Sequence, residues 1–221
     1  SEKIAVIGAG VDAVRFEQAD GAAVRQRHGI GDRPLVAFIG QQGRNKGIDG
    51  LILAMKQVWR EVPEARLLIA GAATHFTAHI QNLIRTRLSP AEQARIIHLH
   101  NFSEDEKPGL FAACDVFAYP SRYESFGTAF IEAWAAGRPV IGCRAGAVPS
   151  VVSDGTDGVL VAPDDPASLS QAVLLLLRSP HLRRRLGQAG REKVWQRYTW
   201  ETVVPRWREV YECVVDKRDG G

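Results

Sequence analysis

The sequence predicts an α/β fold in which a doubly wound parallel sheet carries helices on both faces. Two observations lead to this prediction. Short, continuously apolar runs alternate with longer amphipathic stretches along the chain. The 221 residues are 45% hydrophobic and 24% charged, which is enough for the core of one globular domain. Because strands that are apolar throughout are buried on both faces, the amphipathic stretches must cover the sheet as helices.

The alternation continues from residue 35 to the C-terminus. Strands are expected at 35–40, 66–71, 95–99, 115–120, 139–142 and 158–161. Helices are expected at 47–60, 76–88, 104–114, 126–136, 147–152, 166–178, 182–197 and 200–215. In sheets of this kind, ligands bind beyond the carboxyl ends of the strands, so the residues that follow each strand are the candidates for function.

Composition and charge exclude several classes of protein. No apolar run reaches the roughly 18 residues of a membrane span. The cysteines, Cys114, Cys143 and Cys213, are odd in number and far apart, which argues against a disulfide framework and favours a cytoplasmic location. The net charge of +3 is too small to indicate nucleic acid binding but suits an anionic small ligand. His75 and His79 lack a third ligand, so no metal site is expected.

Two glycine-containing segments compete as a phosphate site. Residues 4–13 fit a strand followed by G-x-G-x-x-A, with Gly8 and Gly10 as the first two glycines, and would suit an NAD(P)-dependent oxidoreductase. However, residues 19–21 interrupt the helix that this motif requires, and no acidic residue ends the next strand. The context therefore does not support a dinucleotide site, although the oxidoreductase is kept as an alternative.

The second segment, residues 40–47, lies between a strand and a helix. Its glycines let the backbone approach an anion closely, and the start of the helix offers free N–H groups. Lys46 and Arg44 add positive charge. This segment is therefore the preferred phosphate site.

Two glutamates follow the strand at 115–120. Glu124 is expected in a loop at the ligand-binding edge, and Glu132 in the helix after it. A carboxylate accepts hydrogen bonds through two oxygens, so each can hold the vicinal hydroxyls of a sugar or a ribose. The start of the helix between them offers N–H groups to hydroxyls or phosphate.

Glu124 and Glu132 have the spacing of a Glu-x7-Glu signature, and residues 120–165 around them resemble the donor-site core of glycosyltransferase family 4, the glycosyl transferases group 1. Residues 7–16 resemble the segment that enters the second domain of that family, and residues 40–47 resemble its first glycine-rich loop. Members have the two-domain GT-B fold, so the resemblance implies that this chain is its Rossmann-like C-terminal domain.

The resemblance also implies roles for individual residues. Lys46 would bind the donor diphosphate, Glu124 would lie near the transferred sugar, and Glu132 would hold the ribose hydroxyls. Gln41 stands where the family usually has an arginine, and whether Arg44 replaces it is left open. The expected catalytic residues are Lys46 and Glu124. The expected donor-binding residues are Gly40, Gln41, Gly43, Arg44, Lys46, Asn101, Phe102, Ser125, Phe126, Gly127, Thr128 and Glu132.

The implied reaction is transfer of a hexose from a nucleoside diphosphate sugar to an acceptor hydroxyl, with retained anomeric configuration and without cofactor or metal. UDP- or GDP-sugars are favoured as donors, and a sugar, glycan or lipid is the acceptor. Residues 1–17 would lead into the domain, 18–199 would bind the donor, and 200–216 would form a crossover helix. The resemblance also implies that the N-terminal acceptor domain is absent from these residues and that they are inactive alone. A module that binds nucleotide sugars without transfer is the other alternative, and peripheral membrane contact of the full-length enzyme is left open.

Overall fold

A single parallel sheet organises the part of the chain that the computed structural model describes, residues 7–219 (side chains to 215). Its strands are β1 (Leu35–Ile39), β2 (Arg66–Ala70), β3 (Ile96–Leu99), β4 (Val116–Tyr119), β5 (Val140–Cys143) and β6 (Gly158–Val161). They lie in the order β3-β2-β1-β4-β5-β6, and every neighbouring pair is parallel. This is the doubly wound order, which confirms the predicted fold class.

Helices cover both faces of this sheet. On one face, α3 (Ile48–Glu61) packs against α9 (Pro166–Arg178) and α4 (Thr77–Arg87). On the other, α6 (Lys107–Ala113) packs against α2 (Gly21–Arg27) and α7 (Thr128–Ala135), and α7 contacts α10 (Pro180–Arg197). The remaining short elements are α1 (Ala13–Glu17), η1 (Arg44–Lys46), α5 (Pro90–Gln93) and α8 (Val148–Val151).

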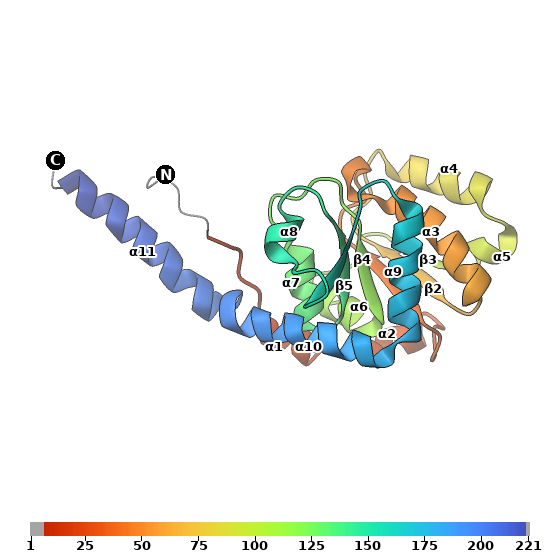
Figure 1. The fold of residues 1–221 in the computed structure, drawn as a ribbon, viewed down its shortest axis with the longest axis horizontal. Helices are drawn as coiled ribbons and strands as arrows, with labels where there is room; N and C mark the ends of the chain where they lie inside the picture. The colour runs from red at the N-terminus through yellow and green to blue at the C-terminus, as the bar shows by residue number, and fades with distance from the viewer. Residues whose placement is uncertain (1–6, 220–221) are drawn as a thin grey trace.

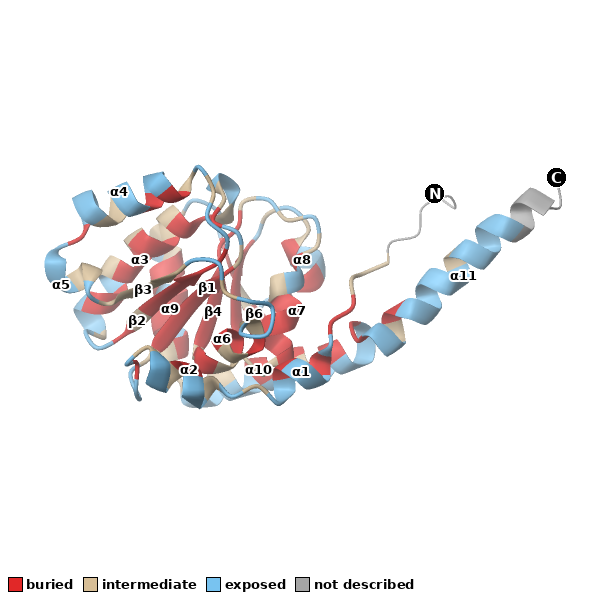
Figure 2. Ribbon diagram, turned by 180° about the vertical axis from the view of Figure 1, so that it is seen from behind, coloured by how far each residue is buried: buried red, intermediate tan, exposed pale blue. Residues whose placement is uncertain are grey.

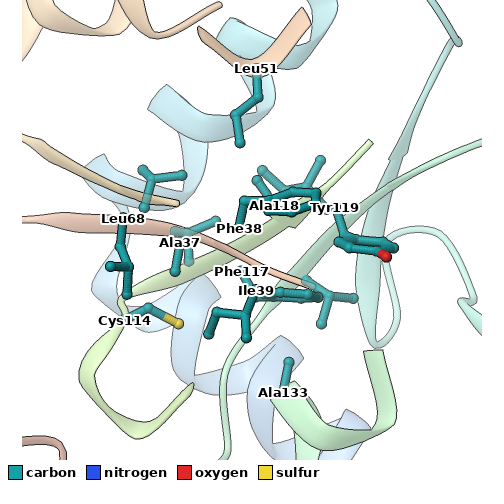
Figure 3. Close-up of a cluster of buried hydrophobic side chains, with 14 of the residues drawn as sticks. Ala37, Phe38, Ile39, Leu51, Leu68, Cys114, Phe117, Ala118, Tyr119 and Ala133 are labelled. Atoms are coloured by element: carbon teal, nitrogen blue, oxygen red, sulfur yellow. The ribbon is translucent and has the colours of Figure 1, made fainter. Parts of the chain in front are cut away.

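The core lies between the sheet and these two helical layers. All five residues of β1 are buried, as the continuous apolar pattern predicts. Figure 3 shows the aromatic side chains that fill the centre: Phe38 stacks on Tyr119 with ring centroids 4.9 Å apart, and Phe117 lies beside Tyr119. Tyr119 is the last residue of β4, so this packing reaches the carboxyl edge of the sheet and makes a rigid floor there.

Two helices begin two or three residues later than the sequence pattern suggests. The helix expected from residue 126 begins at Thr128, because Gly127 adopts a left-handed conformation with φ of +92°. The helix expected from residue 104 begins at Lys107, after a turn in which the Glu106 carboxylate accepts a hydrogen bond from the Ser103 backbone N–H at 3.0 Å. Both shifts affect loops at the ligand-binding edge.

The C-terminal helix α11 (Trp200–Asp219) extends away from the body of the domain (Figure 1). It begins where predicted and continues past residue 216. Val203 is buried, but Trp207 is 42% and Tyr211 63% exposed, so several large apolar side chains of this helix face solvent (Figure 2). Among the described residues, no helix is both long enough and apolar enough to cross a bilayer.

Candidate functional site

The candidate site lies at the carboxyl edge of the sheet, where β1 and β4 are neighbours. The chain leaves these two strands in opposite directions, so their loops diverge and open a crevice between them. A cavity of about 460 Å³ lies at this edge, of a size typical for small-molecule sites. It is lined by Ile39, Gly40, Gln41, Gly71, Ala72, Asn101, Phe102, Glu104, Lys107, Ala129 and Glu132. We call it the donor-edge pocket.

Five residues expected to bind a donor line this pocket together: Gly40, Gln41, Asn101, Phe102 and Glu132. They come from the loop after β1, the loop after β3 and helix α7. The loop after β2 completes the wall with Gly71 and Ala72.

Glu132 is the charged group buried in this pocket. It lies in the second turn of α7, is only 9% exposed, and its Oε1 is 2.6 Å from the Lys107 Nζ. Burial raises the pKa of the Glu132 carboxyl, and the hydrogen bond from Lys107 opposes that shift. A carboxylate so placed offers oxygens to ligand hydroxyls once Lys107 moves aside.

Lys107 is a site residue that the sequence reasoning missed. It begins α6 directly after the Asn101–Phe102 loop, and its Nζ also lies 3.6 Å from a Glu104 carboxylate oxygen. A lysine at the start of a helix is ordinarily unfavourable there, because the helix dipole places partial positive charge at that end. This unusual position was the only feature of the sequence that could have indicated a functional role for Lys107.

Lys46 and Glu124, the two residues expected to be catalytic, form an ion pair. The Lys46 Nζ lies 2.5 Å from the Glu124 Oε1, and the side chains are 23% and 10% exposed. The ammonium also sits 5.5 Å from the centre of the Tyr119 ring. Burial, followed by the charge of Glu124, raises the pKa of Tyr119. Sequence positions 78 apart thus meet beside the donor-edge pocket, although neither side chain lines it.

Backbone contacts fix this pair in place. The Arg122 N–H donates to the Asn45 carbonyl at 2.7 Å, and the Ser121 hydroxyl donates to the same oxygen at 3.1 Å. On the other side, the Ala147 N–H donates to the Glu124 carbonyl at 3.0 Å. Gly47 has a φ of +71°, and a Cβ there would lie 2.0 Å from the Pro120 carbonyl oxygen. The loop after β4 therefore packs directly on the glycine-rich loop.

The remaining predicted residues lie near the pocket but do not line it. Arg44 is exposed and lines another cavity, which it shares with His75, His79 and Arg122. Ser125 and Thr128 are exposed at the start of α7, and the Phe126 ring packs edge-on against Tyr198, 5.8 Å away. Donor contacts by these residues, and by the predicted residues that do line the pocket, stay predictions. Among the described residues, no three His, Cys, Asp or Glu side chains are grouped to hold a metal ion.

In its described part, from residue 7 onward, the segment with Gly8 and Gly10 does not form a sheet-edge phosphate loop. Most of its expected strand, residues 4–6, lies outside the described residues, and residues 7–10 have no regular secondary structure. A Cβ on Gly8 would meet the Phe126 ring at 2.7 Å, and one on Gly10 would meet the Trp200 ring at 2.4 Å. These glycines therefore allow close packing against aromatic rings.

The structure defines a doubly wound α/β domain with a pocket at the carboxyl edge of its sheet, and comparisons with known proteins identify its family. The model of the family described as "Glycosyl transferases group 1" matches residues 21–193. The chain belongs to this family, and it corresponds to the C-terminal domain of the GT-B fold.

One curated relative is a "GDP-mannose-dependent alpha-(1-6)-phosphatidylinositol monomannoside mannosyltransferase" from Mycolicibacterium smegmatis. It is 32% identical over 210 residues, which cover 91% of this chain and 54% of the relative. Another is a "D-inositol 3-phosphate glycosyltransferase" from Segniliparus rotundus, 34% identical over 206 residues, covering 92% of this chain and 45% of the relative. The chain thus spans about half the length of these relatives.

Among solved structures, Anabaena Alr3699/HepE in complex with UDP and glucose superimposes with a TM-score of 0.87 at 25% identity. The match covers 96% of this chain and 57% of that one.

Proposed function

We propose that this chain is the donor-binding domain of a retaining glycosyltransferase that moves a hexose from a nucleoside diphosphate sugar to an acceptor hydroxyl. One observation carries the proposal: the Lys46–Glu124 pair and the pocket with buried Glu132 lie side by side where β1 and β4 diverge. A cationic group for phosphates and a carboxylate for vicinal hydroxyls are the two recognition elements that such a donor requires.

Each charged residue has a part in this proposal. Glu132 accepts hydrogen bonds from the ribose hydroxyls after Lys107 leaves it. Lys46 leaves its ion pair with Glu124 and binds the diphosphate. It then stabilises the negative charge that develops as the diphosphate departs. Glu124, released from Lys46, faces the transferred sugar. Catalysis then comes from positioning and from stabilising the leaving group, and no protein nucleophile is proposed.

UDP- and GDP-sugars are the proposed donors. A relative is named for GDP-mannose, and a structural neighbour holds UDP and glucose, so both bases occur among similar proteins. The proposed acceptors are sugars, glycans and lipids, since the Mycolicibacterium relative is named for a phosphatidylinositol monomannoside. Such an acceptor would bring a cytoplasmic enzyme into peripheral contact with a membrane.

We also propose that transfer needs a second domain to hold the acceptor. The relatives are about twice as long as this chain, and α11 leaves Trp207 and Tyr211 exposed with room for a partner. The acceptor oxygen must come within about 3–3.5 Å of the donor carbon. A donor-binding domain alone would not hold the acceptor at that distance. The chain alone should therefore bind donors without transferring sugar.

Binding of UDP or GDP without a divalent ion is the direct test. Lys46 and the backbone N–H groups of the glycine-rich loop supply the positive potential, so calorimetry in the presence of a chelator should detect one site per chain. NAD serves as the control ligand and should not bind. Binding that appears only after Mg²⁺ or Mn²⁺ is added would show that the proposed charge balance is wrong.

A Glu124→Gln variant separates the sugar from the nucleotide. It removes the carboxylate that competes for Lys46, so affinity for UDP or GDP should be unchanged or tighter. The wild type should bind the sugar nucleotide more tightly than the bare nucleotide, and the variant should bind the two equally. Both affinities are measurable by calorimetry. Glu104→Gln, which changes an exposed carboxylate at the pocket, is the matched control. A large loss of affinity for the bare nucleotide in Glu124→Gln would mean that Glu124 holds the ribose or the base instead.

A further inference from the structure

Gln42 is a fully buried polar side chain directly behind the wall of the donor-edge pocket. It follows Gln41 in the glycine-rich loop, is 0% exposed, and does not line the pocket. Its own loop supplies Gly40 and Gln41 to that wall. An amide is costly to bury unless its hydrogen bonds are made, so its partners reveal its role.

Those partners come from the loop after β2, from strand β3 and from the loop that follows β3. The Gln42 Nε2 donates to the Gly71 carbonyl at 3.1 Å and lies 3.4 Å from the His100 Nδ1. Its Oε1 lies 3.0 Å from the His98 Nε2. The backbone adds two contacts: the Gln42 N–H donates to the Ala72 carbonyl at 3.1 Å, and the Thr74 hydroxyl donates to the Gln42 carbonyl at 2.5 Å.

The protonation of this network follows from its geometry. The Gly71 carbonyl only accepts, so the amide nitrogen of Gln42 must face it and the amide oxygen must face His98. The His98 Nε2 therefore carries a hydrogen and donates. Burial, followed by the neighbouring His100, lowers the pKa of His98 to about 4, so His98 is neutral at physiological pH. A neutral His98 keeps the buried network free of charge.

The three loops that Gln42 joins form one wall of the donor-edge pocket. Gly40 and Gln41 come from the loop after β1, Gly71 and Ala72 from the loop after β2, and Asn101 from the loop after β3. Asn101 is in the left-handed region with φ of 54°, a conformation that needs support from its surroundings. The residue before it, His100, is in contact with Gln42.

We propose that Gln42 is a positioning residue for nucleotide binding: it sets the spacing of the three loops that contact the donor, without touching the donor itself. This inference rests on the proposed function. Under this inference, nucleotide affinity depends on Gln42 as well as on the residues that line the pocket. An apolar side chain of equal volume would fill the same space, but it would form no hydrogen bonds with the Gly71 carbonyl, His98 or His100.

The test is a Gln42→Met variant, which keeps the volume and removes the amide. We expect UDP or GDP affinity to fall about tenfold, on the order of one or two lost hydrogen bonds. Amide hydrogen exchange of the free protein should accelerate in the loops 40–43, 71–73 and 100–102 but not in β4 or α7. Gln93→Met is the matched control, since Gln93 donates to the Leu88 carbonyl at 2.9 Å near the opposite edge of the sheet. It should leave affinity unchanged.

A melting temperature lowered by Gln42→Met with unchanged affinity and unchanged loop exchange would overturn the inference, because Gln42 would then serve only the stability of the fold. If Gln42→Met does not fold, the double variant Gln42→Leu/His98→Phe replaces both partners by apolar groups, a change that is often nearly neutral for stability. This double variant should still bind about tenfold more weakly, and wild-type affinity would overturn the inference. Failure of the wild type to bind any nucleotide would overturn the proposed function. That outcome is distinct from failure of this inference, because hydrogen exchange is measured on the free protein.

Discussion

A Glu132→Ala variant is expected to bind UDP or GDP about 10- to 150-fold more weakly than the wild type. This range corresponds to the roughly 1.5–3 kcal/mol that a hydrogen bond to a charged group contributes. Calorimetry with ribose and dideoxyribose nucleotides measures the effect. The dideoxy ligand should bind weakly to the wild type and lose little more in the variant. Equal losses for both ligands would exclude Glu132 as the ribose partner. Glu104→Ala, at the same pocket but exposed, is the control and should have a much smaller effect.

The same carboxylate should reduce the stability of the free domain at neutral pH. Burial raises the pKa of Glu132 above its ordinary value of 4.5, so its ionised form is less favourable in the folded than in the unfolded chain. The protonated carboxyl therefore adds its full contribution to stability below pH 4.5. This contribution is lost as the pH rises through the pKa that Glu132 has in the folded protein. In urea unfolding, a Glu132→Gln variant should gain stability relative to the wild type as the pH rises from 4 to 8.

The second large effect is expected at Gly47. Gly47→Ala combines a left-handed backbone, at about 1–2 kcal/mol, with a Cβ placed 2.0 Å from the Pro120 carbonyl oxygen. The glycine-rich loop and the loop after β4 must separate, so we expect a loss of about 2–5 kcal/mol in the free energy of unfolding. Nucleotide affinity should fall at least tenfold, because Lys46 is the adjacent residue. Urea unfolding and calorimetry check the two effects.

Gly50→Ala provides the matched control for Gly47→Ala. Gly50 lies in the first turn of α3, and nothing lies within 4 Å of where its Cβ would be. Alanine is the better helix former, so this variant should gain about 0.5–1 kcal/mol and bind nucleotide normally. If Gly47→Ala is as stable as Gly50→Ala, the close contact between the two loops does not exist in solution.

The fold was predictable because burial on both faces of a sheet leaves a direct mark on the sequence. Apart from Arg66 in β2 and His98 in β3, the strands contain only apolar and aromatic residues, and the predicted strands match β1 to β6 to within a residue at each end. Candidate residues such as Gly40, Asn101 and Glu132 were found because they follow strands whose ends meet at one edge. Periodicity carries this information without any knowledge of the tertiary contacts.

The residues that were missed depend on contacts between loops, which no local pattern records. Lys107 belongs to the pocket because its ammonium reaches Glu132 from another helix. Gln42 looks like an ordinary loop glutamine, yet its partners lie 29 to 58 residues away. Arg44 follows the glycine-rich pattern in the sequence, and its side chain lines a different cavity, so its contact with a diphosphate stays a prediction.

The two lysine–glutamate pairs have a consequence for selectivity among cellular phosphates. In the free protein, Lys46 is occupied by Glu124 and Lys107 by Glu132, so neither cation is available without displacing an internal anion. Under the proposed function, inorganic phosphate would replace only Glu124 at Lys46, and a free nucleoside would replace only Lys107 at Glu132. A nucleoside diphosphate would replace both in one binding event, so it would lose its translational freedom only once. Internal competition of this kind would discriminate against fragments of the ligand, and the two ion pairs would form again each time the product leaves.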